Sequence, residues 1–213
     1  MDQIKPYIGR TLRIFISYSS EDKELAGKFK ASLDDYGFET FLAHEDIEFG
    51  AEWEEKIIQE IESCDIFLPL LTKDFKNSEW TSQEIGVAFE LNKKILPIKI
   101  DMDPYGFIRG IQALRFDKLE LTARAPSLQL IEILKKDKVF TEGLKDTLIR
   151  GFVNAGSFDS ANAKAGLLRE IEEFNIEQVN EIIRGALINS PEFFCQIDLK
   201  RVACLPSGRH NCF

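Results

Sequence analysis

The sequence predicts an α/β fold in which a largely parallel sheet of five strands carries helices on both faces. Two observations lead to this prediction. From Leu12 onward, short apolar runs alternate with longer stretches of helical period, which is typical of successive βα units. Beyond about Phe140 the strand-like runs stop, so we expect a smaller region there that is built only from helices.

Each expected strand is a short apolar segment that ends at a turn or at the start of a helix. A sheet of this class places ligand sites at the carboxyl ends of its strands. That rule singles out residues 18–22, 43–50 and 72–80 as the loops that could hold a ligand. The strands read "LRIFISY", "FETFLA", "CDIFLPLL", "KILPIKID" and, more weakly, the stretch near Arg115 to Phe116.

The helices between these strands show apolar residues at three- and four-residue steps. The first is the clearest, because Leu25, Phe29 and Leu33 recur every four residues and Gly37 follows as a stop signal. The expected helices of this part are "EDKELAGKFKASLDDYG", "AEWEEKIIQEIES", "SEWTSQEIGVAFELNKK" and "PSLQLIEILKKD".

We divide the chain into residues 1–140 and a helical C-terminal region, residues 141–213. Three helices are expected in the second part, with Ser160 or Asp159 and Asn175 as N-caps and with Gly151 and Gly156 as breaks. Much of the final stretch "CQIDLKRVACLPSGRHNCF" has no period, and we expect it to be poorly ordered.

The composition restricts the class of protein. The chain has 213 residues, of which 44% are hydrophobic and 30% charged, and its net charge is -9. No apolar run reaches the length of a membrane span and no signal sequence begins the chain, so we expect a cytoplasmic protein without a membrane partner. No basic cluster is present, which argues against nucleic acid as a ligand. With two histidines and no C-x-x-C pair we expect no metal; irregular spacing favours free thiols over a zinc site at Cys195, Cys204, His210 and Cys212.

One carboxylate falls where a helix should bury apolar side chains. In "NSEWTSQEIGVAFELNKK", Glu84 lies about 40° from Trp80 on the helical wheel, inside an arc that also holds Val87, Ala88 and Leu91. A leucine would serve packing better there. Glu84 is therefore either a carboxylate tied to a backbone amide at the edge of the packed face or a functional residue in a partly desolvated site.

Two common α/β sites do not fit this sequence. A phosphoacceptor receiver domain needs acidic residues after the first strand and an aspartate after the third, but these positions read "SYSS" and "PLLT". A dinucleotide-binding Rossmann domain needs G-x-G-x-x-G after the first strand, and "SYSSED" contains no glycine. Any nucleotide would have to be held in another way.

Several segments, in order, resemble the Toll/interleukin-1 receptor (TIR) domains, specifically bacterial ones. They are "IFISYSSED", "GFETFLAHEDIEFGAEW" with the second strand and the BB loop, "CDIFLPLLT", "SEWTSQEIGVAFELNKKILPI" and "GFIRGIQAL". The resemblance covers roughly residues 11–140 and not the helical region. It implies a flavodoxin-like sheet of five parallel strands.

The resemblance also implies an activity. Enzymatic members of the family cleave the bond between nicotinamide and ribose in NAD, and the glutamate of a W-x-x-x-E arrangement is catalytic; Trp80 and Glu84 resemble those positions. The chemistry agrees, because nicotinamide leaves as a neutral molecule and one carboxylate can stabilise the oxocarbenium-like transition state. NAD would be the substrate, and no cofactor is expected.

Six further positions are candidates for substrate binding, each with a structural alternative. The aromatic rings could stack on nicotinamide or adenine, or could be ordinary packing residues. The acidic side chains of the BB loop resemble ribose-facing positions, or belong to a solvated loop that turns at Gly50. Ser17, Ser19 and Ser20, at the end of the first strand and just after it, could donate to phosphates, but capping of the next helix is favoured. The candidates are Tyr18, Ser19, Asp46, Glu48, Trp53 and Trp80.

Two classes of function remain open. The first is an NAD-consuming effector of immunity or stress that self-associates through TIR to TIR contacts, the BB loop included. The second is a non-catalytic TIR scaffold, and the Trp80 and Glu84 pair favours the enzyme over it. Nucleoside deoxyribosyl transfer would also use a lone carboxylate near a ribose, but the BB-loop resemblance argues against it. The helical region is expected either to self-associate or bind a partner and so control when the TIR part is active, or to extend the core of the TIR part.

Overall fold

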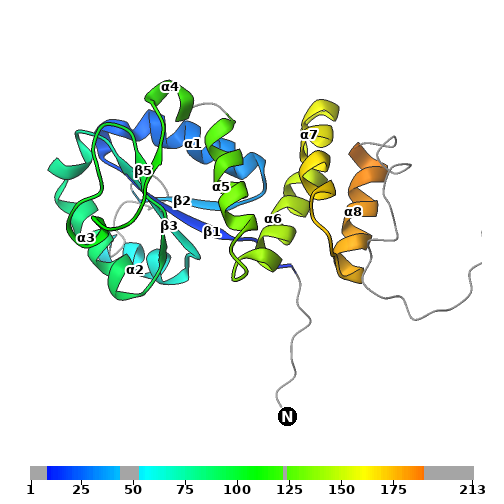
Figure 1. The fold of residues 1–213 in the computed structure, drawn as a ribbon, viewed down its shortest axis with the longest axis horizontal. Coiled ribbons are helices and arrows are strands. Elements are labelled where there is room, and N and C mark those ends of the chain that lie inside the picture. Colours follow the sequence, from blue (N-terminus) through cyan, green and yellow to red (C-terminus); the bar gives the residue numbers. More distant parts are fainter. Residues whose placement is uncertain (1–8, 44–52, 122–123, 190–213) are drawn as a thin grey trace, which may run out of the picture.

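A parallel sheet forms the centre of the larger part of the molecule (Figure 1). The structure is a computed structural model that describes residues 9–43, 53–121 and 124–189. Within these residues the sheet has six strands in the order β2-β1-β3-β5-β6, and β4 also pairs with β3. The strands are β1 (Arg13–Ser17), β2 (Glu39–Leu42), β3 (Ile66–Leu71), β4 (Lys94–Ile95), β5 (Ile98–Lys99) and β6 (Leu114–Arg115).

The difference between five expected and six observed strands comes from one interruption. The segment "KILPIKID" forms β4 and β5, which lie on the same side of β3 and pair with its first and second halves. Pro97 lies between them and has no N–H to donate to the ladder. If β4 and β5 are taken as one broken strand, the strand order is the 2-1-3-4-5 order of flavodoxin-like sheets, as expected.

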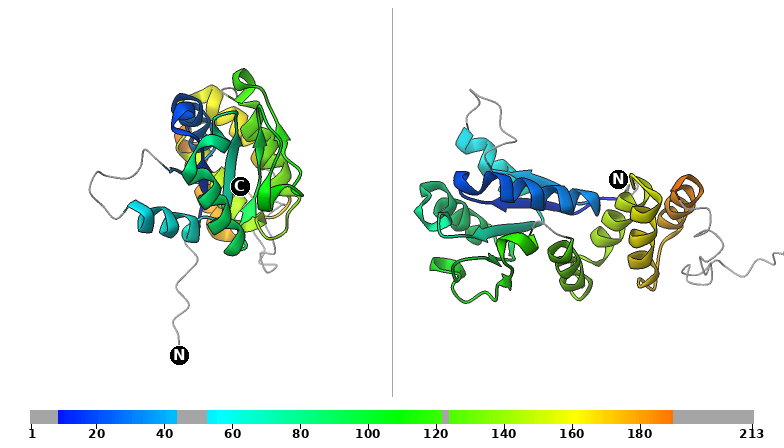
Figure 2. Two further views of the ribbon diagram at one scale, coloured as in Figure 1. Left: turned by 90° about the vertical axis from the view of Figure 1, so that its left-hand side faces the viewer. Right: turned by 90° about the horizontal axis from the view of Figure 1, so that it is seen from above.

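Helices cover both faces of this sheet and continue past one end of it (Figures 1 and 2). Side chains along β1 alternate between the faces, so Ile14 and Ile16 join one apolar cluster and Phe15 joins the other. The helices are α1 (Lys23–Asp35), α2 (Trp53–Ser63), α3 (Glu79–Glu90), α4 (Lys118–Leu121), α5 (Ala125–Lys135), α6 (Thr141–Val153), α7 (Phe158–Arg169) and α8 (Ile176–Asn189), with short 3-10 turns η1 (Ser20–Asp22), η2 (Phe75–Asn77) and η3 (Gly106–Ile108).

The two clusters divide the helices between the faces. Helices α2 and α3 pack on the face that carries Phe15 and Phe67, with Ile61 and Ile85 as buried contacts. Helices α1, α4 and α5 pack on the opposite face, and that cluster runs on without a break into α6, α7 and α8. The helical region therefore shares a core with the sheet.

Close backbone contact joins α6 to the sheet domain. Gly37, at φ +97°, follows α1, and its backbone lies so close to Gly151 of α6 that a Cβ on Gly151 would stand 2.4 Å from the carbonyl oxygen of Tyr36. The Thr147 hydroxyl accepts a 2.8 Å hydrogen bond from the Leu12 N–H just before β1. Gly151 thus lies inside α6, so its expected role as a helix break is wrong.

The outer helices begin at defined caps. Helix α7 begins after Ser157, whose hydroxyl accepts from the Ser160 N–H at 3.2 Å, so the N-cap is three residues before the expected Ser160. Asn175 caps α8 as expected: its side chain accepts from the Gln178 N–H at 2.9 Å, and the Gln178 side chain accepts from the Asn175 N–H at 3.1 Å. The stretch of 195–213 expected to be poorly ordered lies outside the described residues.

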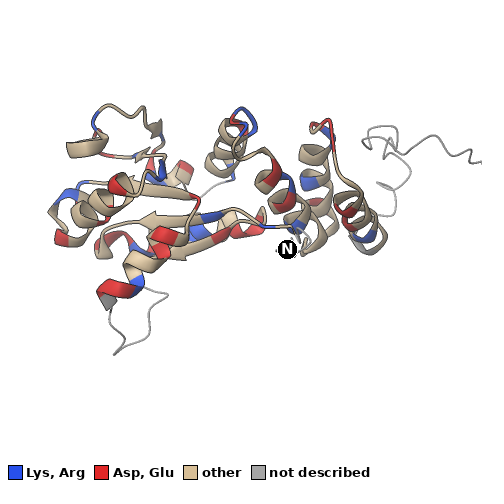
Figure 3. Ribbon diagram, turned by 90° about the horizontal axis from the view of Figure 1, so that it is seen from below, with Lys and Arg blue, Asp and Glu red and all other residues tan. Residues whose placement is uncertain are grey.

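Charged side chains of both signs are interspersed over the described chain (Figure 3). Several form ion pairs that connect α7 to the sheet domain. Lys164, 3% exposed, pairs with Asp35 of α1 at 2.8 Å, and Lys135 of α5 pairs with Glu170. These pairs connect α7 and its C-cap residue to α1 and α5.

Candidate active site

Glu84 lies in the middle of α3, on the side that packs against the sheet. Its side chain is 2% exposed, and Thr81, Ile85 and Ala88 are the other buried residues of this helix. The helical wheel therefore placed Glu84 on the buried face correctly. It placed Leu91 there as well, but Leu91 is 37% exposed, because the buried face is centred nearer to Ile85 than to Trp80.

The last residue of β1 holds this carboxyl group. Ser17 is 0% exposed and follows Phe15 on the face of the sheet that α3 covers. Its hydroxyl donates a hydrogen bond to Oε2 of Glu84. The other oxygen, Oε1, is buried and has no hydrogen-bond partner among the described residues. Thus one oxygen of the carboxyl is held by a hydrogen bond, and the other is buried without a partner in the described chain.

Burial changes the acidity of this group. Desolvation raises the pKa of Glu84 to about 8, and the hydrogen bond from Ser17 opposes that effect in part. Near neutral pH the carboxyl is therefore mostly protonated when nothing else is bound beside it. A positive charge nearby would favour the ionised form.

A second polar contact fastens the loops on either side of Ser17. The buried carboxylate of Asp22, in η1 after β1, accepts from the hydroxyl of Thr72, the first residue after β3. The same Thr72 oxygen accepts from the Phe75 N–H at 3.2 Å, and the ammonium of Lys118 lies 3.4 Å from Asp22. These contacts join the carboxyl ends of neighbouring strands, where the fold places ligand sites.

Comparison with known proteins now identifies the fold family. A family model described as "TIR domain" matches residues 14–129. The chain belongs to the TIR domain family. The matched residues contain both Ser17 and Glu84.

Individual relatives of this TIR protein match more distantly. It is 31% identical over 93 residues to the "Probable 2' cyclic ADP-D-ribose synthase TcpO" of Methanobrevibacter olleyae, a match that covers 42% of this chain and 27% of that protein. Among solved structures, it is similar to the TIR domain of the Toll-related receptor TRR-2 from Hydra magnipapillata, with 19% identity, a TM-score of 0.47, and coverage of 56% of this chain and 94% of that one. It is also similar to the CMP N-glycosidase BcmB of Clostridium botulinum, with 19% identity, a TM-score of 0.40, and coverage of 56% and 98%.

The TIR fold brings some of the predicted site residues together and separates others. Trp80 is half-buried in the first turn of α3, one helical turn before Glu84. Tyr18 is 0% exposed and belongs to the apolar cluster on the opposite face of the sheet from α3, a position that favours its packing role. Ser19 is buried at the start of η1, and its side chain makes no cap hydrogen bond, so the favoured capping role is wrong for this residue.

The other predicted site residues cannot be compared with this geometry. Asp46 and Glu48 of the BB loop lie outside the described residues. Trp53 is the first residue of α2, but the structure does not describe its side chain. The substrate-binding roles of these residues stay predictions.

The partners of Glu84 and Thr72 were not predicted from the sequence of this TIR chain. Ser17 was considered only as a phosphate donor or a cap, and Asp22 and Thr72 were named only as members of candidate loops. Ser17 and Glu84 are separated by 67 residues, and Asp22 and Thr72 by 50. The available signal was the polar residue that ends each apolar strand, which shows that a side chain lies at the sheet end but not what it contacts.

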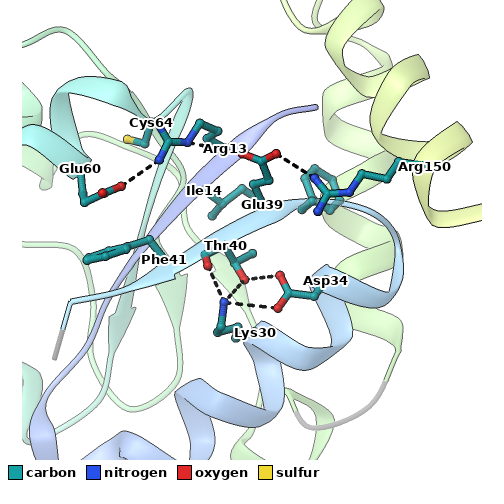
Figure 4. A pocket seen from close by; sticks show the side chains of 11 residues that line it. Arg13, Ile14, Lys30, Asp34, Glu39, Thr40, Phe41, Glu60, Cys64 and Arg150 are labelled. Carbon is teal, nitrogen blue, oxygen red and sulfur yellow. Dashed lines mark hydrogen bonds and ion pairs between the residues drawn. The ribbon is translucent and has the colours of Figure 1, made fainter. Parts of the chain in front are cut away.

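A separate cavity of about 450 Å³ lies against the edge strand β2 (Figure 4). Its charged side chains pair with one another: Arg13 contacts Glu60 at 2.9 Å, and Arg150 contacts Glu39 at 2.8 Å. Burial raises the pKa of the Cys64 thiol to about 11, so it stays protonated near neutral pH. Among the described residues that line this cavity, there is therefore neither an unpaired charge nor a reactive thiol.

The described part of the TIR chain shows neither a metal-binding cluster nor a membrane-spanning helix. In residues 9–43, 53–121 and 124–189, no three His, Cys, Asp or Glu side chains are grouped so that they could hold a metal ion. The four residues considered for a zinc site lie outside those ranges. No described helix has the length and apolar character needed to cross a membrane.

Proposed function

We propose that this TIR protein cleaves the bond between nicotinamide and ribose in NAD, with Glu84 as the catalytic carboxylate. The observation that supports this most directly is the state of the Glu84 carboxyl: it is buried near the carboxyl ends of the strands, with one oxygen held by Ser17 and the other without a partner among the described residues. The named activity of the Methanobrevibacter relative supports the substrate class, because ADP-ribose is what remains of NAD once nicotinamide has left.

The chemistry requires a negative charge beside the ribose. When the C1'–N bond breaks, its electron pair leaves with the nicotinamide nitrogen, and positive charge develops on the ribose carbon and ring oxygen. An ionised Glu84 in a desolvated site stabilises this charge strongly. The nicotinamide ring of bound NAD is itself positively charged, which favours loss of the Glu84 proton as substrate binds. A water molecule or another part of the same molecule then reaches C1', giving ADP-ribose or a cyclised form.

Substitution of Glu84 tests the assignment. Glu84→Gln keeps the size of the side chain and removes its charge, so we expect nicotinamide release from NAD to fall by far more than tenfold. The matched control is Glu90→Gln, the same change at an exposed position on α3, which should keep full activity. Retention of activity within about tenfold in Glu84→Gln, about 1.4 kcal/mol in barrier height, would show that the assignment is wrong.

We infer a cytoplasmic effector of immunity or stress whose activity depends on self-association through TIR to TIR contacts. The specific rate of nicotinamide release should therefore rise with protein concentration or with crowding. A purified chain that assembles but releases no nicotinamide under any of these conditions would instead support the non-catalytic scaffold.

A further inference from the structure

Ser17 occupies a position that the fold holds firmly. It is the last residue of β1, which is paired on one side with β2 and on the other with β3, and it is in register with Pro69 of β3. Its side chain is completely buried. Because neighbouring strands fix the backbone on which the hydroxyl stands, the hydroxyl can hold a partner in one orientation.

The carboxyl group that it contacts has asymmetric surroundings. Oε2 of Glu84 accepts the Ser17 hydrogen bond, whereas Oε1 is buried and has no partner in the described chain. A buried polar atom without a partner costs roughly 1–3 kcal/mol, and such atoms are few in native proteins. A group that only stabilised the fold would not keep this cost, so the arrangement points to a role in binding or catalysis.

We propose that Ser17 is the positioning residue of this site: its hydroxyl fixes Oε2 of Glu84 so that Oε1 is presented to the ribose carbon of the substrate. This inference rests on the proposed function. Ser17 itself does not touch the reacting atoms. It acts through Glu84 by limiting rotation of the carboxyl group and by donating a hydrogen bond that is stronger to the ionised form.

Because the Ser17 hydroxyl bonds more strongly to the ionised carboxyl, it also influences the pKa of Glu84. The hydrogen bond from Ser17 lowers the pKa of Glu84 against the larger effect of burial. Removal of the hydroxyl should therefore move ionisation of Glu84 to higher pH. Substitution of a residue that served only for packing would leave the pKa of Glu84 unchanged.

The test compares two buried serines. Ser17→Ala removes the hydroxyl that contacts Glu84, while Ser127→Ala makes the same change at another fully buried position, on α5, where the hydroxyl contacts Ser32 at 2.8 Å. The ionisation of Glu84 is followed by carbon NMR of labelled carboxyl groups, with Glu84→Gln used to assign the signal. The pH profile of kcat/KM for nicotinamide release is measured in parallel.

For Ser17→Ala we expect a higher titration midpoint for Glu84, a fall in kcat of at least tenfold at pH 7 with little change in KM, and a smaller loss at pH 9. Ser127→Ala should change neither the midpoint nor the profile. If Ser17→Ala does not fold, Ser17→Cys, which keeps the size but donates weakly, should still raise the midpoint.

Two results separate the failure of this inference from the failure of the proposed function. An unchanged Glu84 midpoint in a folded Ser17 variant, or an unchanged pH profile in an active one, would overturn the positioning role and leave NAD cleavage standing. If the unsubstituted chain released no nicotinamide, the proposed function would be wrong, and so would the role of Ser17 in presenting Oε1 to a substrate. The NMR titration would then decide only whether the Ser17 hydroxyl holds the carboxyl.

Discussion

Glu84 carries its proton to a higher pH in the folded chain than in the unfolded one, and this difference makes stability depend on pH. The folded pKa is about 8, whereas an exposed glutamate has a pKa near 4.3. Between these values, unfolding releases a proton from Glu84. The contribution of protonated Glu84 to the free energy of unfolding is therefore complete below about pH 4. It decreases as the pH rises through this window and is lost above about pH 8.

The Glu84→Gln variant should lack this dependence. From pH 5.5 to pH 7.5 we expect its free energy of unfolding to rise relative to that of the unsubstituted chain by about 2–3 kcal/mol, since each pH unit in the window contributes about 1.4 kcal/mol. Denaturant unfolding at the two pH values measures the difference. Parallel stability curves for the two proteins would mean that Glu84 is ionised at neutral pH in the fold.

Single residues also show what the sequence can and cannot predict. The buried position of Glu84 followed from its place on one helix, because a helical period relates neighbours three and four residues apart. Its contact with Ser17 depends on the position of α3 over the end of β1, which no local pattern contains. For Tyr18, strand alternation could have predicted the opposite face, since Ser17 and Tyr18 are consecutive in sequence.

Among the elements, α6 was predicted as a helix but not as part of the close contact with α1. Glycine usually weakens a helix interior, so Gly151 was interpreted as a break. In the fold it allows the α6 backbone to approach the backbone around Gly37. Sequence pattern alone does not distinguish a glycine that ends a helix from one that lets another segment approach it.

Substitution of this glycine separates helix propensity from packing. Gly151→Ala should favour the isolated helix, yet its Cβ would stand 2.4 Å from the Tyr36 carbonyl oxygen and 3.0 Å from the Gly37 nitrogen. Because these are backbone atoms, we expect a net destabilisation of about 1–3 kcal/mol. Thermal or denaturant unfolding measures it.

Gly166→Ala in α7 is the matched control. It adds the same methyl group where nothing lies within 4 Å, so it should stabilise the protein by about 0.5–1 kcal/mol. If both variants were more stable than the unsubstituted chain, the backbone around Gly37 could not lie as close to α6 as described.

At the scale of the whole molecule, the helical region extends the TIR core. Leu144, Leu148 and Phe152 of α6 lie in the same apolar cluster as Ile14 and Ile16 of β1. This packing matches the second of the two arrangements that the sequence left open, and the role of the helical region in binding a partner stays a prediction. The surface against which the apolar side chains of α7 and α8 pack depends on tertiary structure, which no local pattern contains. Ile176 and Leu187 remain 56% and 64% exposed on α8.

Truncation tests this continuity. A chain of residues 1–140 would lose the α6 side chains that cover the cluster and the Thr147 hydroxyl that accepts from Leu12. We therefore expect it to be unfolded or aggregated by circular dichroism and size-exclusion chromatography. A chain of residues 1–189, which keeps α6, α7 and α8, should remain folded. If residues 1–140 melted within a few degrees of the full chain, the sheet domain would be independent of α6.

The contacts at the two ends of β1 give this strand a mechanical role. Just before β1, the Leu12 N–H donates a hydrogen bond to Thr147 of α6. At the other end of β1, the Ser17 hydroxyl donates a hydrogen bond to Glu84. The five residues of β1 form a stiff segment roughly 16 Å long, held laterally by β2 and β3. Any force that displaced α6 along the strand axis would be transmitted to the Ser17 hydroxyl without passing through a flexible loop.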